Sequence, residues 1–217
     1  MDMNVLVLNM YRVSVDYFKE NNPKYYDEVS EIEEKVDLYE HLIHDYLMKL
    51  TETHLDTSDS YKQSEYIDVI RDFERIGDHA MNFAEFFNTY YERGVVMSER
   101  MKEDLLKFFA IVDDQIADTV KAFETNNKVV SKIIIEREGK VDIMEKEYRL
   151  NVHSYFKEGE VNQLDIFFID CVSNLERISD HTTNIAQMII DPHMMSTMIT
   201  GSYEKPIKIE DIDKTTN

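Results

Sequence analysis

The chain has 217 residues, of which 44 are acidic and 24 basic, giving a formal net charge of −20. So acidic a surface repels the phosphate backbone of nucleic acids and an anionic membrane, and it favours cations or basic partners. With five glycines and three prolines the chain has few helix breakers, so we expect long helices rather than sheets.

Hydrophobic periodicity and its interruptions predict six helices along the chain. Asn22-Pro23 suits a helix start, because proline in the first turn has no hydrogen bond to lose. Ser60 followed by Gln63 fits a capping box, and Gly94 and Gly159 fall in short polar breaks that are typical of helix ends. The predicted helices span residues 2–19, 24–54, 60–92, 98–125, 127–157 and 161–190.

The two halves of the chain repeat one another. FERIGDHAMNFAEF (73–86) and LERISDHTTNIAQM (175–188) are identical at seven of fourteen positions, and EEKVDLYE (33–40) matches EGKVDIME (138–145). Three helices per half can close a small bundle around one apolar seam. The sequence therefore predicts an all-α fold of two tandem three-helix bundles, covering residues 1–95 and 96–192, with a loose C-terminal tail over 193–217.

Carboxylates spaced four apart form acidic stripes on the predicted helices. Glu74 and Asp78 lie about 40° apart around their helix, on one face and away from the apolar seam at Ile76. Glu33 and Asp37 repeat this arrangement on the preceding helix. If the two helices pack as neighbours, four carboxylates converge on the outside of the bundle.

The second half contains the same two pairs, so the device occurs twice. Like charges at this spacing repel by a few tenths of a kcal/mol, and a bound cation would relieve the repulsion. Carboxylate oxygens suit Mg, Ca, Mn or iron, and solvated acidic faces are the alternative explanation. The candidate metal ligands are Glu33, Asp37, Glu74, Asp78, Glu138, Asp142, Glu176 and Asp180.

The remaining candidate residues favour structural roles. His79 and His181 point roughly 100° away from the neighbouring aspartates, so we expect inter-helix polar contacts rather than metal ligation. For Arg75 and Arg177 we expect structural salt bridges rather than phosphate contacts. Cys171 has no nucleophile context and is expected to be buried. Without a nucleophile–base pair or a glycine-rich phosphate loop, we predict no catalytic residues and no enzymatic activity.

The duplicated ERIGDHAMNFAEF and ERISDHTTNIAQM, with the upstream Glu-x-x-x-Asp segments, resemble the PhoU family of phosphate-signalling proteins over residues 1–190. The resemblance implies two similar three-helix bundles and a regulator of phosphate uptake rather than an enzyme. It also implies surface metal clusters at the eight carboxylates, with iron expected first and Mg, Mn, Ca or Zn left open. The second copy departs from the pattern: Ser179 stands where glycine is more usual, and Gln187 and Arg149 reduce the acidity around the second cluster.

The resemblance extends to the cytosolic tail of bacterial sodium–phosphate cotransporters. It implies a phosphate transporter as partner, tethered or associated, and a place at the inner face of the membrane. The single cysteine and the absence of an apolar run near the ~18 residues of a membrane span also indicate a soluble cytoplasmic chain. The sequence does not decide whether the chain is a freestanding protein or an excised tail, or whether it is a monomer or a homodimer.

Two alternative functions compete with this interpretation. The chain could be a helical scaffold whose acidic faces bind a basic partner. It could also be a carboxylate-bridged di-iron bundle, but such bundles use inward-facing Glu-x-x-His pairs, and no Glu is followed by His three residues later in this chain.

Overall fold

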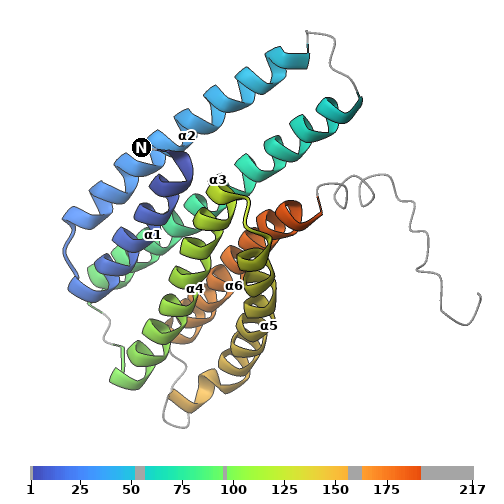
Figure 1. Ribbon diagram of the computed structural model, residues 1–217. Helices are drawn as coiled ribbons and strands as arrows, with labels where there is room; N and C mark the ends of the chain where they lie inside the picture. The colour runs from blue at the N-terminus through green and yellow to red at the C-terminus, as the bar shows by residue number, and fades with distance from the viewer. Residues whose placement is uncertain (1, 52–56, 95–96, 156–162, 192–217) are drawn as a thin grey trace, which may run out of the picture.

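The computed structural model describes residues 2–51, 57–94, 97–155 and 163–191; the predicted tail over 193–217 and the break at Gly159 lie outside them. The described part is all-helical (Figure 1). None of its helices combines the length and apolarity that a membrane crossing requires. The helices are α1 (Met3–Glu20), α2 (Lys24–Thr51), α3 (Thr57–Glu92), α4 (Glu99–Thr125), α5 (Lys128–Asn151) and α6 (Gln163–Ile190), with a 3-10 turn η1 (Val152–Tyr155) after α5.

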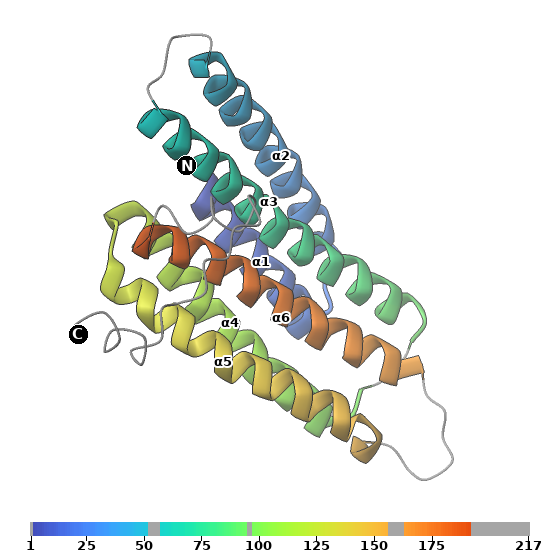
Figure 2. The same ribbon diagram turned by 90° about the vertical axis from the view of Figure 1, so that its right-hand side faces the viewer.

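The two repeats form two groups of three helices joined along α3 and α6. In each repeat the three helices run up and down, α1–α2–α3 and α4–α5–α6 (Figure 2). α3 and α6 lie antiparallel across the middle of the molecule, and α1 also contacts α4. Buried apolar side chains of both repeats belong to one continuous core. The predicted all-α fold and its internal duplication are therefore confirmed, whereas the division into 1–95 and 96–192 stays a prediction.

Equivalent turns end the first helix of each repeat. Asn21 and Asn126 both adopt the left-handed conformation with φ of 49°, which asparagine tolerates better than most residues. The side chain of Asn127 then caps α5 by accepting from the backbone N–H groups of Val129 and Val130. Gly94 follows α3 with φ of 60°, as expected for a residue just past a helix end.

Two predicted boundaries are wrong. α3 begins at Thr57, so Ser60 lies within the helix and does not form a capping box. Gln63 instead donates its side-chain N–H to the backbone carbonyl of Leu47 and so ties α3 to α2. At the other boundary, α5 does not continue to residue 157, because the chain tightens into the 3-10 turn at Val152.

A buried polar contact joins α3 to α6. His79 donates from Nδ1 to Oδ1 of Asn174 at 2.7 Å, and Asn82 donates to the same oxygen at 3.3 Å. Burial lowers the pKa of His79 to about 4, so this ring is neutral at physiological pH. Because the amide oxygen can only accept, the proton of the neutral ring lies on Nδ1.

An equivalent contact runs from α6 to α3, so that the histidine now lies on α6 and its acceptor on α3. His181 donates from Nδ1 to Oδ1 of Asp72 at 2.8 Å, and Asn184 donates to that oxygen at 3.2 Å. The rings of His79 and His181 stack with centroids 5.6 Å apart. The predicted inter-helix role of both histidines is therefore confirmed. The sequence pattern did not identify Asp72 and Asn174, although these polar residues occupy equivalent positions, 102 residues apart.

The cores of the two repeats differ at one matched pair of positions. In the first repeat, a Cβ atom added at Gly77 would lie 3.6 Å from Met10 Sδ and 3.6 Å from Val36. In the second repeat, Ser179 accepts a hydrogen bond from the side-chain amide of Gln115 at 2.7 Å, and both residues are fully buried. Gln115 corresponds to Met10, and Ser179 to Gly77. The replacement of glycine by serine is thus matched by a replacement in the facing helix.

We predict that Ser179→Ala lowers the free energy of unfolding by about 1–3 kcal/mol, because the buried amide of Gln115 loses its acceptor. The double variant Gln115→Met/Ser179→Gly, which copies the first repeat, should recover most of this loss. Gly77→Ala is the control and should be neutral or stabilising, because its new methyl group meets only ordinary contacts. Urea denaturation measures all three, and a fully stable Ser179→Ala protein would contradict the prediction.

Candidate metal centre

The first acidic group lies between α2 and α3. α2 supplies Glu33 and Asp37, and α3 supplies Glu74 and Asp78. Negative charge on Asp37 and Asp78 raises the pKa of Glu33, and negative charge on Asp37 also raises the pKa of Glu74 and of Asp78. The four carboxylates that the sequence predicted for this group therefore lie near enough to influence one another's charge, on the outer side of the helix pair, but the described residues do not place three of them as close together as in the second group.

Burial is the largest cause of these pKa shifts. The side chain of Glu74 is half-buried, and burial together with the nearby charge of Asp78 raises its pKa to about 7. Burial likewise raises the pKa of Glu33 and of Asp78. At neutral pH this group therefore concentrates negative charge in a partly desolvated place, which is costly without a cation.

The second acidic group lies between α5 and α6. Carboxylate oxygens of Glu138, Asp142 and Asp180 all lie within 4.8 Å of one another, the tightest such set in the described part of the chain. Glu176 is close enough for Asp180 and Asp142 to raise its pKa, after the larger effect of burial. Burial and Asp142 also raise the pKa of Asp180. All four predicted residues of this group are thus also neighbours.

Basic residues border the second group more closely than the first. Lys146 lies 3.4 Å from Asp142, and Arg149 pairs with Glu145 at 2.5 Å and donates to Ser173 at 2.6 Å. Arg149 is the replacement that the sequence singled out, and it does reduce the acidity beside the cluster. It does not separate the three clustered carboxylates, which form a more compact set than the sequence led us to expect.

The two arginines of the motifs face solvent, whereas the single cysteine lies in the core. Arg75 and Arg177 are exposed, and within the described ranges neither forms the salt bridge we expected. Arg75 still lowers the pKa of Glu74 and Asp78, and Arg177 that of Glu176, although burial outweighs both effects. Cys171 is fully buried, and burial raises its pKa well above the ordinary value, so its thiol stays protonated.

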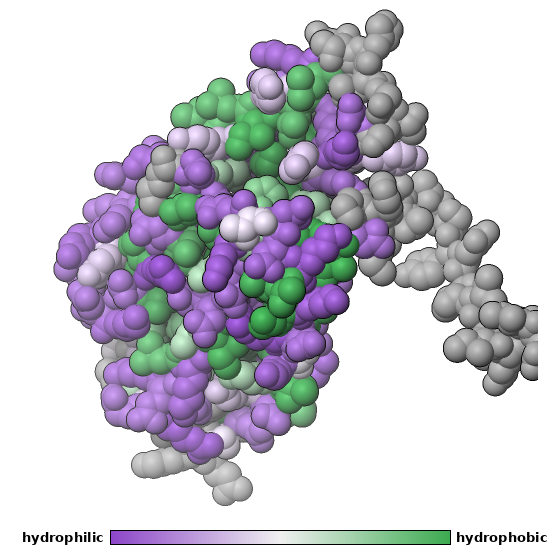
Figure 3. Space-filling view, in the orientation of Figure 1, coloured by the Kyte–Doolittle hydropathy of each residue, from purple (hydrophilic) through white to green (hydrophobic). Residues whose placement is uncertain are grey.

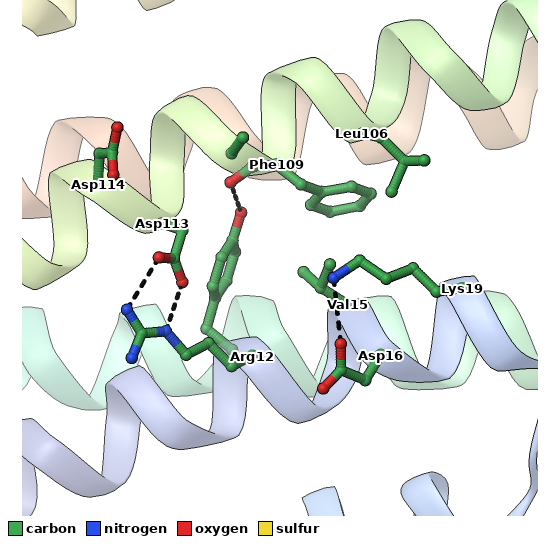
Figure 4. A pocket seen from close by; sticks show the side chains of 10 residues that line it. Arg12, Val15, Asp16, Lys19, Leu106, Phe109, Asp113 and Asp114 are labelled. Carbon is green, nitrogen blue, oxygen red and sulfur yellow. Dashed lines mark hydrogen bonds and ion pairs between the residues drawn. The ribbon is translucent and has the colours of Figure 1, made fainter.

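A separate groove of about 640 Å³ lies between α1 and α4 (Figure 4). Arg12 crosses it and pairs with both carboxylate oxygens of Asp113 at 2.7 and 2.9 Å. Lys19 pairs with Asp16 at 3.1 Å. The cations that line this groove are thus neutralised by neighbouring acids, and it contains no nucleophile–base pair. It supplies contacts between the repeats rather than a catalytic centre.

The raised pKa of Glu74 makes the stability of the metal-free protein depend on pH. Because its folded pKa of about 7 exceeds its ordinary value of 4.5, the folded state binds the proton more tightly. This contribution to stability is complete below pH 4.5 and is lost as the pH rises through about 7. In chelator-treated protein we predict that Glu74→Gln loses less stability than the parent between pH 5 and pH 8.

Thermal melts at the two pH values measure this difference, which we expect at roughly 2–4 °C given the partial exposure of the group. Glu31→Gln, which neutralises an exposed glutamate on α2, is the control and should follow the parent. Equal pH dependence in the parent and Glu74→Gln would contradict the prediction.

Comparison with known proteins identifies the family. The family model described as "PhoU domain" matches residues 1–87 and 105–189. The phosphate-specific transport system accessory protein PhoU homolog 1 of Thermotoga maritima is 30% identical over 134 residues, covering 59% of this chain and 57% of that protein. A PhoU homolog of Clostridium acetobutylicum is 31% identical over 127 residues, covering 57% and 56%. The match thus spans little more than half the length of either relative.

Solved structures show the same fold over more of the chain. PhoU from Pseudomonas aeruginosa superposes with a TM-score of 0.79 at 21% identity, covering 92% of this chain and 93% of that one. The phosphate transport system regulatory protein PhoU from Streptococcus pneumoniae gives a TM-score of 0.77 at 16% identity, covering 89% and 90%. The Streptococcus pneumoniae protein is named a regulatory protein, and the Thermotoga maritima and Clostridium acetobutylicum relatives are named accessory proteins. The chain belongs to the PhoU family.

Proposed function

We propose that this protein is a non-enzymatic regulator of phosphate uptake or phosphate signalling that holds metal ions on its two acidic groups. The observation that carries the proposal is the convergence of matched carboxylates from neighbouring helices in both repeats. Membership of the PhoU family supports the regulatory role, since its relatives are named as accessory or regulatory proteins of phosphate transport. The outward-facing carboxylates do not favour the di-iron alternative, whose ligands point into a bundle.

The donor set suits a hard cation. Oxygens of Glu138, Asp142 and Asp180 that lie within 4.8 Å of one another can all reach one ion at about 2.3–2.6 Å. Carboxylates in this number also suit iron, which the family resemblance favours, and Mg, Mn, Ca or Zn are alternatives. A cation at each group would offset the repulsion that raises the carboxyl pKa values. The proposed ligand sets are Glu33, Asp37, Glu74 and Asp78, and Glu138, Asp142, Glu176 and Asp180.

We predict that Glu74→Ala/Asp78→Ala removes metal from the first group, and Asp142→Ala/Asp180→Ala from the second, because each pair contributes one side of its cluster. Elemental analysis of protein purified without chelator should show a loss of about half the bound metal in each variant. Glu99→Ala/Glu103→Ala, an exposed pair with the same spacing on α4, is the matched control. Helical content should be unchanged throughout. Unaltered metal content in both site variants would refute the assignment.

The partner that fits this proposal is a phosphate transporter. Transporters keep Lys and Arg residues on their cytoplasmic side, and a protein of net charge −20 is attracted to such loops. Docking would place the protein at the inner face of the membrane, tethered covalently or bound reversibly. Metal on the acidic groups would reduce the negative charge at this surface and so change the docking.

We predict that binding to the cytosolic face of a phosphate transporter in lipid nanodiscs weakens about tenfold between low and 0.5 M salt, because salt screens exposed charges. Glu74→Ala/Asp78→Ala should bind differently from the parent, and chelator should change the binding of the parent more than that of this variant, which keeps only the second acidic group. Titration with and without metal distinguishes the regulator from the scaffold alternative. Binding that ignores metal and these residues would leave only a scaffold role.

A further inference from the structure

The hairpin of α2 and α3 extends beyond the helix that covers it. α1 has 18 residues, whereas α4, its counterpart in the second repeat, has 27. The repeats align at a spacing of 105 in these helices, so Met3 at the start of α1 corresponds to Phe108 within α4. Among the described residues, nothing equivalent to residues 99–107 of α4 covers the α2–α3 hairpin, which projects past α1 (Figures 1 and 2).

In the second repeat, these first turns of α4 close the apolar core. Met101 and Leu105 are buried against α5 and α6. The ring of Tyr148 contacts the ring of Phe108 and the ring of Phe168, each with centroids 5.8 Å apart. Phe168 on α6 is fully buried, with the ring of Tyr148 from α5 against it.

The equivalent surface in the first repeat is open. Tyr66, the counterpart of Phe168, is 48% exposed, and Tyr39, Leu42 and Tyr46 on α2 are 37%, 56% and 64% exposed. The three α2 residues follow the i, i+3, i+7 spacing of one helix face. We call Tyr39, Leu42, Tyr46 and Tyr66 the hairpin face. Figure 3 shows apolar surface gathered over this projecting part of α2 and α3.

The hairpin face is more apolar than the equivalent surface of the second repeat. Leu42 and Tyr46 correspond to Glu147 and Asn151, which are exposed polar residues on α5. In the second repeat α4 does not cover these two positions, and they are polar. In the first repeat the same two positions carry large apolar side chains. Side chains of this size each contribute about 1.5–3 kcal/mol when they leave water, so an occupant of this face is favoured.

We propose that the hairpin face is covered by the C-terminal segment of this chain, residues 192–217. α6 ends on the side of the molecule where α1 begins and the hairpin projects (Figure 2). Because α6 runs antiparallel to α3 and His181 meets Asp72, Ile190 at the end of α6 lies beside the first turns of α3, close to the level of Tyr66. Three or four extended residues, at about 3.3 Å each, cross one helix diameter of about 10 Å.

The sequence of the segment matches what the face lacks. Met194 and Met198, and likewise Met195 and Ile199, are four residues apart, the spacing of Met101 and Leu105 in α4. Residues 192–203 contain no acidic side chain, so this stretch does not repel the acidic hairpin. A covalently attached segment also binds at a high effective concentration, which favours it over a second copy or a separate partner.

A single tryptophan tests the proposal, because the chain contains none. Tyr66→Trp is compared in the full chain and in a variant ending at Asp191. In the full chain the emission should be blue-shifted and protected from acrylamide, and truncation should shift it to the red and increase quenching several-fold. Phe168→Trp is the matched control: Phe168 itself is fully buried among the described residues, so truncation should leave its emission unchanged and report an intact fold.

A second variant separates docking from any effect of shortening the chain. Met194→Ser/Met198→Ser in the full-length Tyr66→Trp protein should reproduce the effect of truncation, whereas Ile207→Ser/Ile209→Ser should not. Equal exposure of the reporter in the full and shortened chains would overturn the proposal. So would protection that survives truncation and rises with protein concentration, which would assign the face to a second copy. The test is made in the presence of chelator and without a transporter, so its failure can be told apart from a failure of the proposed function.

Discussion

The polar contact between α3 and α6 fixes the arrangement of the whole molecule. An apolar seam alone would tolerate a shift of one helical turn, whereas the bonds of His79 to Asn174 and of His181 to Asp72 are satisfied in one register only. A buried donor or acceptor that loses its partner costs about 1–3 kcal/mol, so a shifted register is penalised several times over. Each histidine directly follows an aspartate of an acidic group. The contact that aligns the repeats therefore also sets the positions of Asp78 and Asp180.

The acidic groups oppose this stabilisation. Burial and mutual repulsion raise the carboxyl pKa values in both clusters, which means that the ionised groups destabilise the fold at neutral pH. Most acidic residues of the chain avoid this cost by facing water, as Glu99 and Glu103 do on α4. A site that breaks the rules of charge placement at matched positions in two repeats is typical of ligand binding rather than of folding. A bound cation would convert the repulsion into attraction.

Local patterns in the sequence predicted the helices, the duplication and the acidic pairs on neighbouring helices, because all three depend on residue spacing within single helices; of the eight predicted metal ligands, three form a close set in the described part of the chain. Contacts between distant segments were not predictable in the same way. Asp72 lies 109 residues from His181, and nothing in its neighbourhood indicates that partner. The predicted start of α3 was wrong for a related reason. Gln63 fitted a local capping box, but its side-chain amide donates a hydrogen bond to the backbone carbonyl of Leu47 on α2. The pairing of Gln115 with Ser179 likewise becomes visible only when the helices are packed.

The two repeats differ in how much of their helix pairs the first helix covers. The second repeat is capped by the first turns of α4, whereas the first acidic group and the hairpin face share the α2–α3 pair without such a cap. Asp37 and Tyr39 are only two residues apart on α2. Whatever holds α2 against α3 at one of these places also restrains it at the other. Because such coupling is reciprocal, a cation at the acidic group would strengthen the binding of an occupant at the hairpin face, and the occupant would strengthen the binding of the cation. Ligand binding would then have its greater effect on structure in the first repeat.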